Sequence, residues 1–153
     1  MMKWLSRVIM VGIAALVIWQ VWQRVFVTDE MRVKKQITVM SGAVEKGNLL
    51  RLSDAVAADY SDDSGMDKST LLGEVLAFRS PYDSVSIHVS ELTVTIDPEH
   101  RKAQAEFIAK VIVRAKGGSS EKEVHSGQIR LFFRKDDAGW RLIRAELPGS
   151  KFD

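Results

Sequence analysis

Residues 48–78, NLLRLSDAVAADYSDDSGMDKSTLLGEVLAF in one-letter code, divide into two apolar segments around an acidic turn. The first segment follows Asn48 and the second follows Asp67, and both residue types favour helix N-caps. Gly65 lies in the turn between them, and Pro81 follows the second segment and is expected to end it. We therefore predict two short helices joined by this turn.

Apolar residues recur at helical spacing in both segments and predict which side of each helix faces the core. In the first segment these residues are Leu49, Leu50, Leu52, Val56 and Tyr60. In the second they are Leu71, Leu72, Val75, Leu76 and Phe78. The two helices are expected to close one side of the domain.

The acids of the turn resemble a calcium-binding loop in composition but not in spacing. If Gly65 took the sixth position of such a loop, Leu71 would take the twelfth, where an acid is required. The acids are therefore interpreted as solvated groups that cap the second helix. No metal site and no cofactor are predicted.

Upstream, residues 8–19 form an uninterrupted apolar run, flanked by Trp4 on one side and Trp22 on the other. From Trp4 to Trp22 a helix would measure about 27 Å, close to the hydrocarbon thickness of a bilayer. Residues 1–27 are therefore predicted to be an uncleaved signal anchor. A cleaved signal peptide and a buried helix are the alternatives; bulky residues at the end of the run disfavour cleavage.

The charge distribution favours a bacterial inner-membrane location with a single span. Lys3 and Arg7 precede the run and favour a cytoplasmic N-terminus, although Arg24 and further basic residues follow it. The domain after the anchor is predicted to be exported to the periplasm.

The composition of the domain excludes some partners and some chemistry. Of the 22 basic residues, three lie in residues 1–27, so the rest of the chain has 19 basic and 20 acidic residues, and nothing indicates a nucleic-acid partner. The sequence has no cysteine, which excludes disulfides and thiol chemistry.

Residues 28–46 are predicted to form the first helix of the domain, with Thr28 as a plausible N-cap. Its apolar stripe is Val33, Ile37, Met40 and Val44. No Gly or Pro lies between Ile13 and Ser41, so the anchor and this helix can also run on as one stalk. A break near Val27 and Thr28 is the alternative.

From Ser84 onward the apolar period changes to two, which predicts four strands joined by short turns. The alternation in the first strand shifts parity at Ser90 and Glu91, the sign of a β-bulge that bends the strand. The short connections predict an antiparallel meander. The predicted fold class is α+β: a transmembrane helix, then a cone-shaped domain (residues 28–148) of three helices on a bent four-stranded antiparallel sheet, then a tail (residues 149–153).

The chain resembles the nuclear transport factor 2-like (cystatin-like, SnoaL-like) superfamily. The resemblance rests on element order, on Asp59-Tyr60 followed by Gly65-Met66-Asp67-Lys68, and on the closing pattern from Arg134 to Ile143, which contains Gly139-Trp140-Arg141. It implies helices packed into the concave face of a bent sheet. The superfamily includes isomerases, dehydratases, binding domains and assembly domains, so the resemblance says little about activity. The chain is most similar to its small membrane-anchored bacterial members.

Enzymes of this superfamily use a carboxylate or His, often with a Tyr, deep in the cone. The candidates here are Asp59, Tyr60, His88 and His125. Tyr60 lies on the apolar stripe and is interpreted mainly as a core ring, and the other three as surface residues. No pair among them has the spacing of an acid–base couple, so no catalytic residue is predicted.

Two further sets of residues are candidates for binding. Small residues on the inward face of the second strand either let a helix approach or leave room for an apolar ligand. The candidate cavity residues are Tyr60, Phe107, Phe133, Ala105 and Ala109. On the outward face, the candidate interaction surface is Ile108, Ile112, Phe132 and Arg130. The alternative interpretation of this face is a set of cross-strand ion pairs, in which Arg130, Arg134, Arg141 and Arg144 face Glu106, Glu123 and Glu146.

The leading functional hypothesis is a non-enzymatic, membrane-anchored, exported domain that binds another envelope protein or itself. In layout alone it is similar to the assembly domains of type IV secretion systems. The second hypothesis is a binding protein for a small apolar or lipid-like ligand held in the cone. An isomerase or dehydratase-like enzyme is the third.

Overall fold

The computed structural model describes residues 2–148, without the side chains of residues 2–5 and 23–28, so the predicted tail at residues 149–153 lies outside it. The described residues form three helices followed by four strands. The helices are α1 (Met2–Lys46), α2 (Leu49–Ala55) and α3 (Lys68–Arg79). The strands are β1 (Tyr82–Ile96), β2 (Lys102–Ala115), β3 (Glu121–Asp136) and β4 (Gly139–Glu146). This is the α+β order predicted from the sequence.

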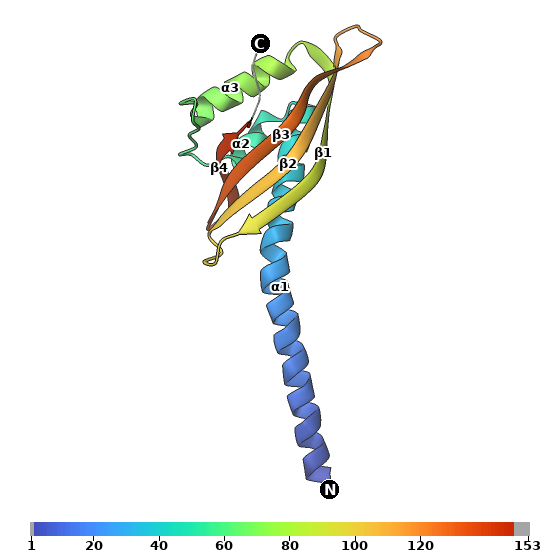
Figure 1. The fold of residues 1–153 in the computed structure, drawn as a ribbon, viewed down its shortest axis with the longest axis vertical. Coiled ribbons are helices and arrows are strands. Elements are labelled where there is room, and N and C mark those ends of the chain that lie inside the picture. Colours follow the sequence, from blue (N-terminus) through green and yellow to red (C-terminus); the bar gives the residue numbers. More distant parts are fainter. Residues whose placement is uncertain (1, 149–153) are drawn as a thin grey trace.

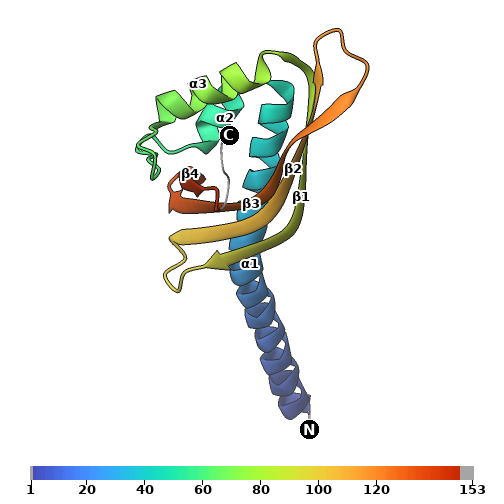
Figure 2. The ribbon, with the colours of Figure 1, turned by 45° about the horizontal axis from the view of Figure 1, so that its top comes forward.

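The four strands form one antiparallel sheet in the order β1-β2-β3-β4, which confirms the predicted meander. The pairing of β1 with β2 shifts between Ser90 and Thr93, and Glu91 has a φ of 53°. This is the bulge that the parity change predicted. Two further shifts, at Val111/Ile112 and at Phe132/Phe133, bend the sheet as well. As a result the sheet curves around the C-terminal part of α1 (Figure 2).

The core lies between the concave face of the sheet and the helices. Val33 and Ile37 of α1 are buried, and Met40 and Val44 pack against the same cluster, which confirms the predicted stripe. Phe133, Trp140 and Leu142 supply the sheet side of this cluster together with small residues of β2. The alternation of buried positions along β2 follows the predicted period of two.

The helix α1 runs without a break from Met2 to Lys46, as one stalk that projects from the domain (Figure 1). The predicted break near Val27 is therefore wrong, and Thr28 does not begin a helix. The continuous stalk, which the absence of Gly and Pro allowed, is the correct alternative. Among the side chains that the structure describes, no helix offers an apolar stretch of the length needed to cross a membrane.

The helix α2 is shorter than its apolar pattern suggested. Asn48 caps it as predicted, because its side chain accepts a hydrogen bond from the Arg51 amide at 3.1 Å. The helix ends at Ala55, and the chain then runs beside β4, where the Ala57 amide donates to the Leu142 carbonyl at 2.9 Å. Tyr60 is thus buried from the loop after α2, where its amide closes a turn by donating to the Ala57 carbonyl at 3.1 Å, while Leu50, predicted inward, is 77% exposed.

The helix α3 lies across the end of the domain away from the N-terminal half of α1 (Figure 1). Asp67 caps it as predicted, accepting from the Thr70 amide at 2.8 Å. Leu76 and Phe78 were predicted to face inward but are 54% and 38% exposed. The prediction failed because α3 touches the core with one narrow face, and it has no fully buried residue.

Candidate functional site

A groove of about 850 Å³ lies between α3, the loop before it and the end of β4. Its surface is mainly apolar. The apolar residues are Met66, Leu71, Val75, Phe78, Ala145 and Leu147, with Tyr60 beside them. The groove is open to the surroundings, so it presents an apolar surface that water covers in the isolated chain.

Local chain geometry sets the α3 wall of this groove. Leu71, Val75 and Phe78 follow at intervals of four and three, so they share one face of α3. Gly65, with a φ of 79°, supplies the left-handed position of the turn that leads into the helix. At the other end, Arg79 donates to the Glu45 carbonyl at 3.1 Å and also to the Tyr82 carbonyl, which ties α3 to α1 and β1.

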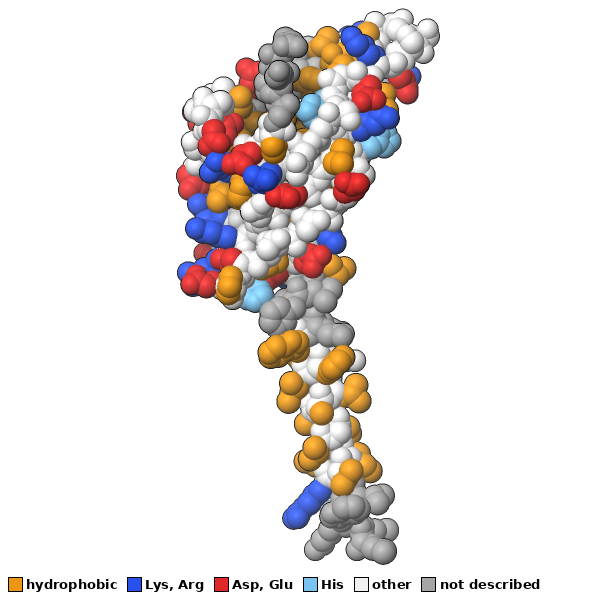
Figure 3. All heavy atoms as spheres, viewed as in Figure 1, with side chains coloured by type: hydrophobic (Ala, Val, Ile, Leu, Met, Phe, Trp, Pro, Cys, Tyr) orange, Lys and Arg blue, Asp and Glu red, His pale blue; other side chains and the backbone are white. Residues whose placement is uncertain are grey.

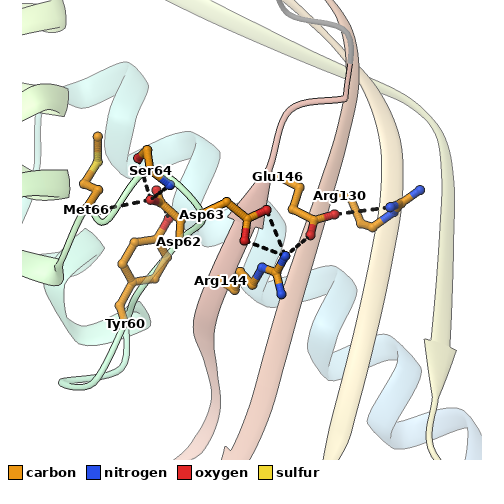
Figure 4. Close-up of polar contacts among 8 residues, drawn as sticks. All are labelled: Tyr60, Asp62, Asp63, Ser64, Met66, Arg130, Arg144 and Glu146. Atoms are coloured by element: carbon orange, nitrogen blue, oxygen red, sulfur yellow. Dashed lines mark hydrogen bonds and ion pairs between the residues drawn. The ribbon is translucent and has the colours of Figure 1, made fainter.

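Tyr60 belongs to the core cluster and also lines the groove. Its ring is buried, and its hydroxyl donates to Asp62 Oδ2 at 3.3 Å (Figure 4). Burial, together with the charge of Asp62, raises the pKa of Tyr60 to about 12. The hydroxyl is therefore neutral at physiological pH and acts as a hydrogen-bond donor.

Asp62 organises the loop between Tyr60 and α3. Partial burial favours its neutral form, but hydrogen bonds to the carboxylate outweigh that effect and lower its pKa. Ser64 donates through its amide at 2.9 Å and through its hydroxyl, and the Met66 amide donates at 3.1 Å. Both oxygens of the Asp62 carboxylate therefore accept hydrogen bonds that hold the loop in place.

An ion-pair network runs along the outer side of the groove (Figure 4). Arg144 lies between Asp63, at 2.8 Å, and Glu146. Glu146 also pairs with Arg130 at 3.2 Å, and Arg130 reaches Glu106 at 2.8 Å. The predicted outward ion pairs of Arg130 and Arg144 are therefore present. Asp63 and Glu146 are therefore paired with arginine, whereas Asp62 and the exposed Glu74, which also line the groove, have no ion pair among the described residues.

The other predicted ion pairs have different partners. Arg134 binds the exposed Asp59 through both carboxylate oxygens, at 2.7 and 2.8 Å, and Arg141 pairs with Asp136 at 2.9 Å. The hydrogen bonds from Arg134 lower the pKa of Asp59. Neither Tyr60, with its raised pKa, nor Asp59 and Asp62, with their lowered pKa values, titrates near neutral pH. These groups are poor candidates for general acid–base catalysis at pH 7.

Among the predicted cavity residues, only Tyr60 lines the groove. Phe107, Phe133, Ala105 and Ala109 are buried in the core cluster that also contains Val33 and Ile37 of α1. Of the other acid–base candidates, His88 is exposed, and His125 is half-buried next to Gly127. The groove therefore lies beside the cone and not at its base.

The predicted interaction residues lie on the face of the sheet away from the core, each is half-buried, and one of them, Arg130, also lines the groove. Phe132 is covered by the Arg144 guanidinium, 5.4 Å from its ring centre. Ile108 and Ile112 flank Lys110, which pairs with Glu123 at 3.5 Å. The role of this face as a docking surface stays a prediction.

Sequence reasoning missed a second polar cluster, at the end of the domain nearest the stalk. Asp29 is buried on α1 and pairs with Lys135 Nζ at 3.1 Å and His100 Nδ1 at 3.3 Å. A signal was present: Asp29 lies four residues before Val33 and eight before Ile37, on the same helical stripe. Its position next to Thr28 suggested a cap instead. No group of three or more potential metal ligands lies together in the described part of the chain.

No protein-family model matches the sequence, and no curated protein matches it. Solved structures match in fold. An NTF2-like protein with a cystatin-like fold from Novosphingobium aromaticivorans is 19% identical with a TM-score of 0.69, covering 86% of this chain and 90% of its own. A candidate scytalone dehydratase from the same organism is 14% identical with a TM-score of 0.71, covering 82% and 86%.

A candidate dehydratase of the NTF2-like family from Streptomyces avermitilis is 14% identical with a TM-score of 0.68, covering 78% of this chain and 95% of its own. At such identities the similarity concerns the backbone arrangement and not the site residues. The chain therefore has the NTF2-like, cystatin-like fold that its sequence resembled.

Proposed function

We propose that this chain is a non-enzymatic, membrane-anchored binding domain whose groove receives an apolar segment of another envelope protein. The observation that carries the proposal is the groove itself. It is lined mainly by apolar side chains, it is open to the surroundings, and two of the acids that line it, Asp63 and Glu146, are paired with arginine. Such a surface gains free energy when another apolar surface replaces water on it.

The form of the groove favours a protein segment as occupant. Phe78 is 38% exposed at one end, where its ring lies 5.5 Å from that of Tyr82, and Leu147 is 40% exposed on the opposite wall. Exposed apolar walls of this kind accept a helix or an extended segment that leaves the groove at its ends. A closed pocket would restrict the occupant to a small molecule.

Anchoring by α1 is supported by the apolar side chains of its first half. From Val8 to Trp22 the large apolar side chains are between 54% and 72% exposed, and Figure 3 shows apolar side chains along both edges of this part of the helix. A helix that is apolar on all sides is stable when lipid or protein surrounds it. Together with Lys3 and Arg7 in the sequence, this supports a single-pass protein of the bacterial inner membrane with an exported domain.

A photo-crosslinking amino acid at Phe78, in the full chain expressed in membranes, tests the proposal. The matched control replaces Val124, which is equally exposed at 38% but lies on β3 away from the groove. We expect one protein adduct at position 78 that is weakened by Val75→Asp and absent at position 124. Recovery of the uncrosslinked chain alone at position 78 would overturn the proposed partner. Activity of a cytoplasmic reporter fused after Asp153 would overturn the exported orientation.

The second candidate is a small apolar or lipid-like ligand, and the volume of the groove favours it. About 850 Å³ lies within the range of about 300–1,000 Å³ that small-molecule sites occupy. Native mass spectrometry of the purified full chain separates the two candidates. A bound small molecule that Val75→Asp removes would support the ligand, and a protein adduct in the crosslinking experiment would support the partner.

A further inference from the structure

A second hollow, of about 410 Å³, lies between α1 and the turn that joins β3 to β4. Arg32 and Lys35 of α1 form one wall, and Lys135 and Trp140 form the other. Gln36 closes the hollow by donating to the Trp140 carbonyl at 2.9 Å. Three cationic side chains therefore surround one small space on a domain whose overall charge is nearly balanced.

The cations of this hollow are only partly neutralised by protein groups. Arg32 and Lys35 have no acidic oxygen within 4.0 Å among the described residues, and Lys135 shares the buried Asp29 with His100. Of the two acids at the hollow, Asp136 is paired with Arg141 at 2.9 Å and accepts from the Ala138 amide. Asp137 is the other, and it is exposed.

Trp140 supplies an aromatic side chain to the wall of the hollow. This side chain is 4% exposed, and the Lys135 ammonium lies 5.9 Å from its ring centre. Its indole nitrogen is buried from solvent, so the groups of the hollow that can bind a ligand are the cations. Arginine and lysine donate charge-assisted hydrogen bonds, which suit an oxyanion, and phosphate in particular.

The position of the hollow along α1 indicates which kind of molecule carries the phosphate that it would bind. Asp29, the first residue after the exposed apolar run that is buried among the described side chains, is seven positions beyond Trp22, about 10 Å along an unbroken helix. The ion pairs of Asp29 with His100 and Lys135 hold the β1–β2 turn and the β3–β4 turn beside this part of α1. Side chains on a helix lean toward its N-terminus, so Arg32 and Lys35 point back toward the apolar half of α1. The headgroup layer begins where the apolar half ends.

We propose that this hollow binds the phosphate of a phospholipid headgroup, which holds the domain against the bilayer surface; this rests on the anchoring proposed above. Because α1 is continuous, the domain cannot swing away from the membrane without bending the helix. The helix α3, which forms one wall of the groove, lies at the end of the domain away from the N-terminal half of α1 (Figure 1), so the bound bilayer leaves the groove uncovered. The protein segment that binds the groove then approaches the domain from the side away from the membrane.

The absence of native cysteine makes a labelling experiment direct. The full chain is reconstituted into phosphatidylcholine vesicles with and without phosphatidylglycerol, carrying a fluorophore at Ala138→Cys beside the hollow. The matched label is Ser119→Cys, in the exposed turn between β2 and β3 at the opposite end of the sheet. A quencher attached to lipid headgroups is expected to quench the label at position 138 several-fold more than the label at 119.

The variant Arg32→Gln/Lys35→Gln tests the hollow itself. Each cation near an anionic surface strengthens binding by about fivefold, so the double variant should need about 25-fold more phosphatidylglycerol for equal quenching at position 138. Lys116→Gln/Lys122→Gln removes two cations near the far turn and is expected to leave the quenching unchanged. Equal loss in both variants would overturn the assignment of the hollow.

Vesicle flotation separates this inference from the anchoring on which it rests. A chain that floats with vesicles, yet shows equal quenching at both labels, is anchored and overturns the headgroup contact. A chain that does not float overturns the anchoring and the contact together. Inorganic phosphate should compete with the headgroup for the hollow and lower the quenching at position 138, and quenching that phosphate leaves unchanged at equal ionic strength would overturn the phosphate assignment.

Discussion

The substitution Asp29→Asn tests whether the buried carboxylate fastens the domain to the stalk. Asp29 is 4% exposed, and its carboxylate pairs with Lys135 Nζ at 3.1 Å and with His100 Nδ1 at 3.3 Å. Asparagine has nearly the same shape, so it removes the negative charge and one acceptor without opening a cavity. The change therefore isolates the ionic part of the contact.

The expected loss follows from the environment of the two partners. A hydrogen bond to a charged group contributes about 1.5–3 kcal/mol. Asparagine keeps one acceptor, and Lys135, whose side chain is 36% exposed, can turn toward water. We therefore expect Asp29→Asn to lower the free energy of unfolding by about 2 kcal/mol, less than the 3–5 kcal/mol typical of a fully buried pair.

The matched control is Glu30→Gln, the next residue on the same helix. Glu30 pairs with Lys34 at 3.0 Å, but both side chains are more than 40% exposed. Such a pair contributes about 0.3–0.5 kcal/mol. The two variants carry the same charge change one position apart, so their difference measures burial.

Urea unfolding of the full chain in detergent micelles provides the measurement. The near-ultraviolet circular dichroism of the buried Trp140 reports the loss of the core, because the other described tryptophans, Trp19 and Trp22, are exposed on α1. With an m-value of about 2 kcal/mol per molar, the midpoint should fall by about 1 M for Asp29→Asn and by about 0.2 M for Glu30→Gln. Equal midpoint shifts for the two variants would refute the reasoning.

Three further predictions concern the core, Tyr60 and Asp59. Ala105→Leu, at a position with no exposed surface, should cost about 1–3 kcal/mol by overpacking, and an unfolding midpoint equal to that of the wild type would show room for a ligand. Because the pKa of Tyr60 is raised to about 12, its contribution of about 2 kcal/mol is complete below pH 10 and is lost as pH rises toward 12. Tyr60→Phe should flatten stability over that range in urea titrations, and an unchanged slope would contradict this. Arg134→Gln should raise the pKa of Asp59 toward its ordinary value in an NMR titration, whereas an unchanged pKa would mean that the hydrogen bonds from Arg134 do not lower it.

The local features of the fold could be read from the sequence. The parity change at Ser90 and Glu91 predicted the bulge that bends β1, and the caps at Asn48 and Asp67 predicted where two helices begin. These features depend on residues that are close together in the chain. The stripe of α1 was also correct, and its extension back to Asp29 would have revealed the buried carboxylate.

Tyr60 shows where such reasoning stops. It was predicted to point inward as part of a helix, and it is buried, but from the loop that follows α2 and pairs with β4. The Ala57 amide donates to the Leu142 carbonyl at 2.9 Å, and the Ser61 amide donates to the Ile143 carbonyl at 3.2 Å. Backbone pairing with a strand more than 80 residues later ended the helix, and no local pattern contains that information.

By itself the sequence determined the order of the elements, their amphipathic faces, the bend in the sheet and the apolar character of the first half of α1. Only the tertiary structure showed that four of the five candidate cavity residues are buried in the core cluster, that α1 is one continuous helix, and that a groove lies beside α3. The physical reason is that periodicity reports which side of an element is buried, whereas a groove depends on how far apart distant elements come to rest. Val75 and Leu147 meet across it only because the ties of Arg79 and the loop held by Asp62 set the position of α3.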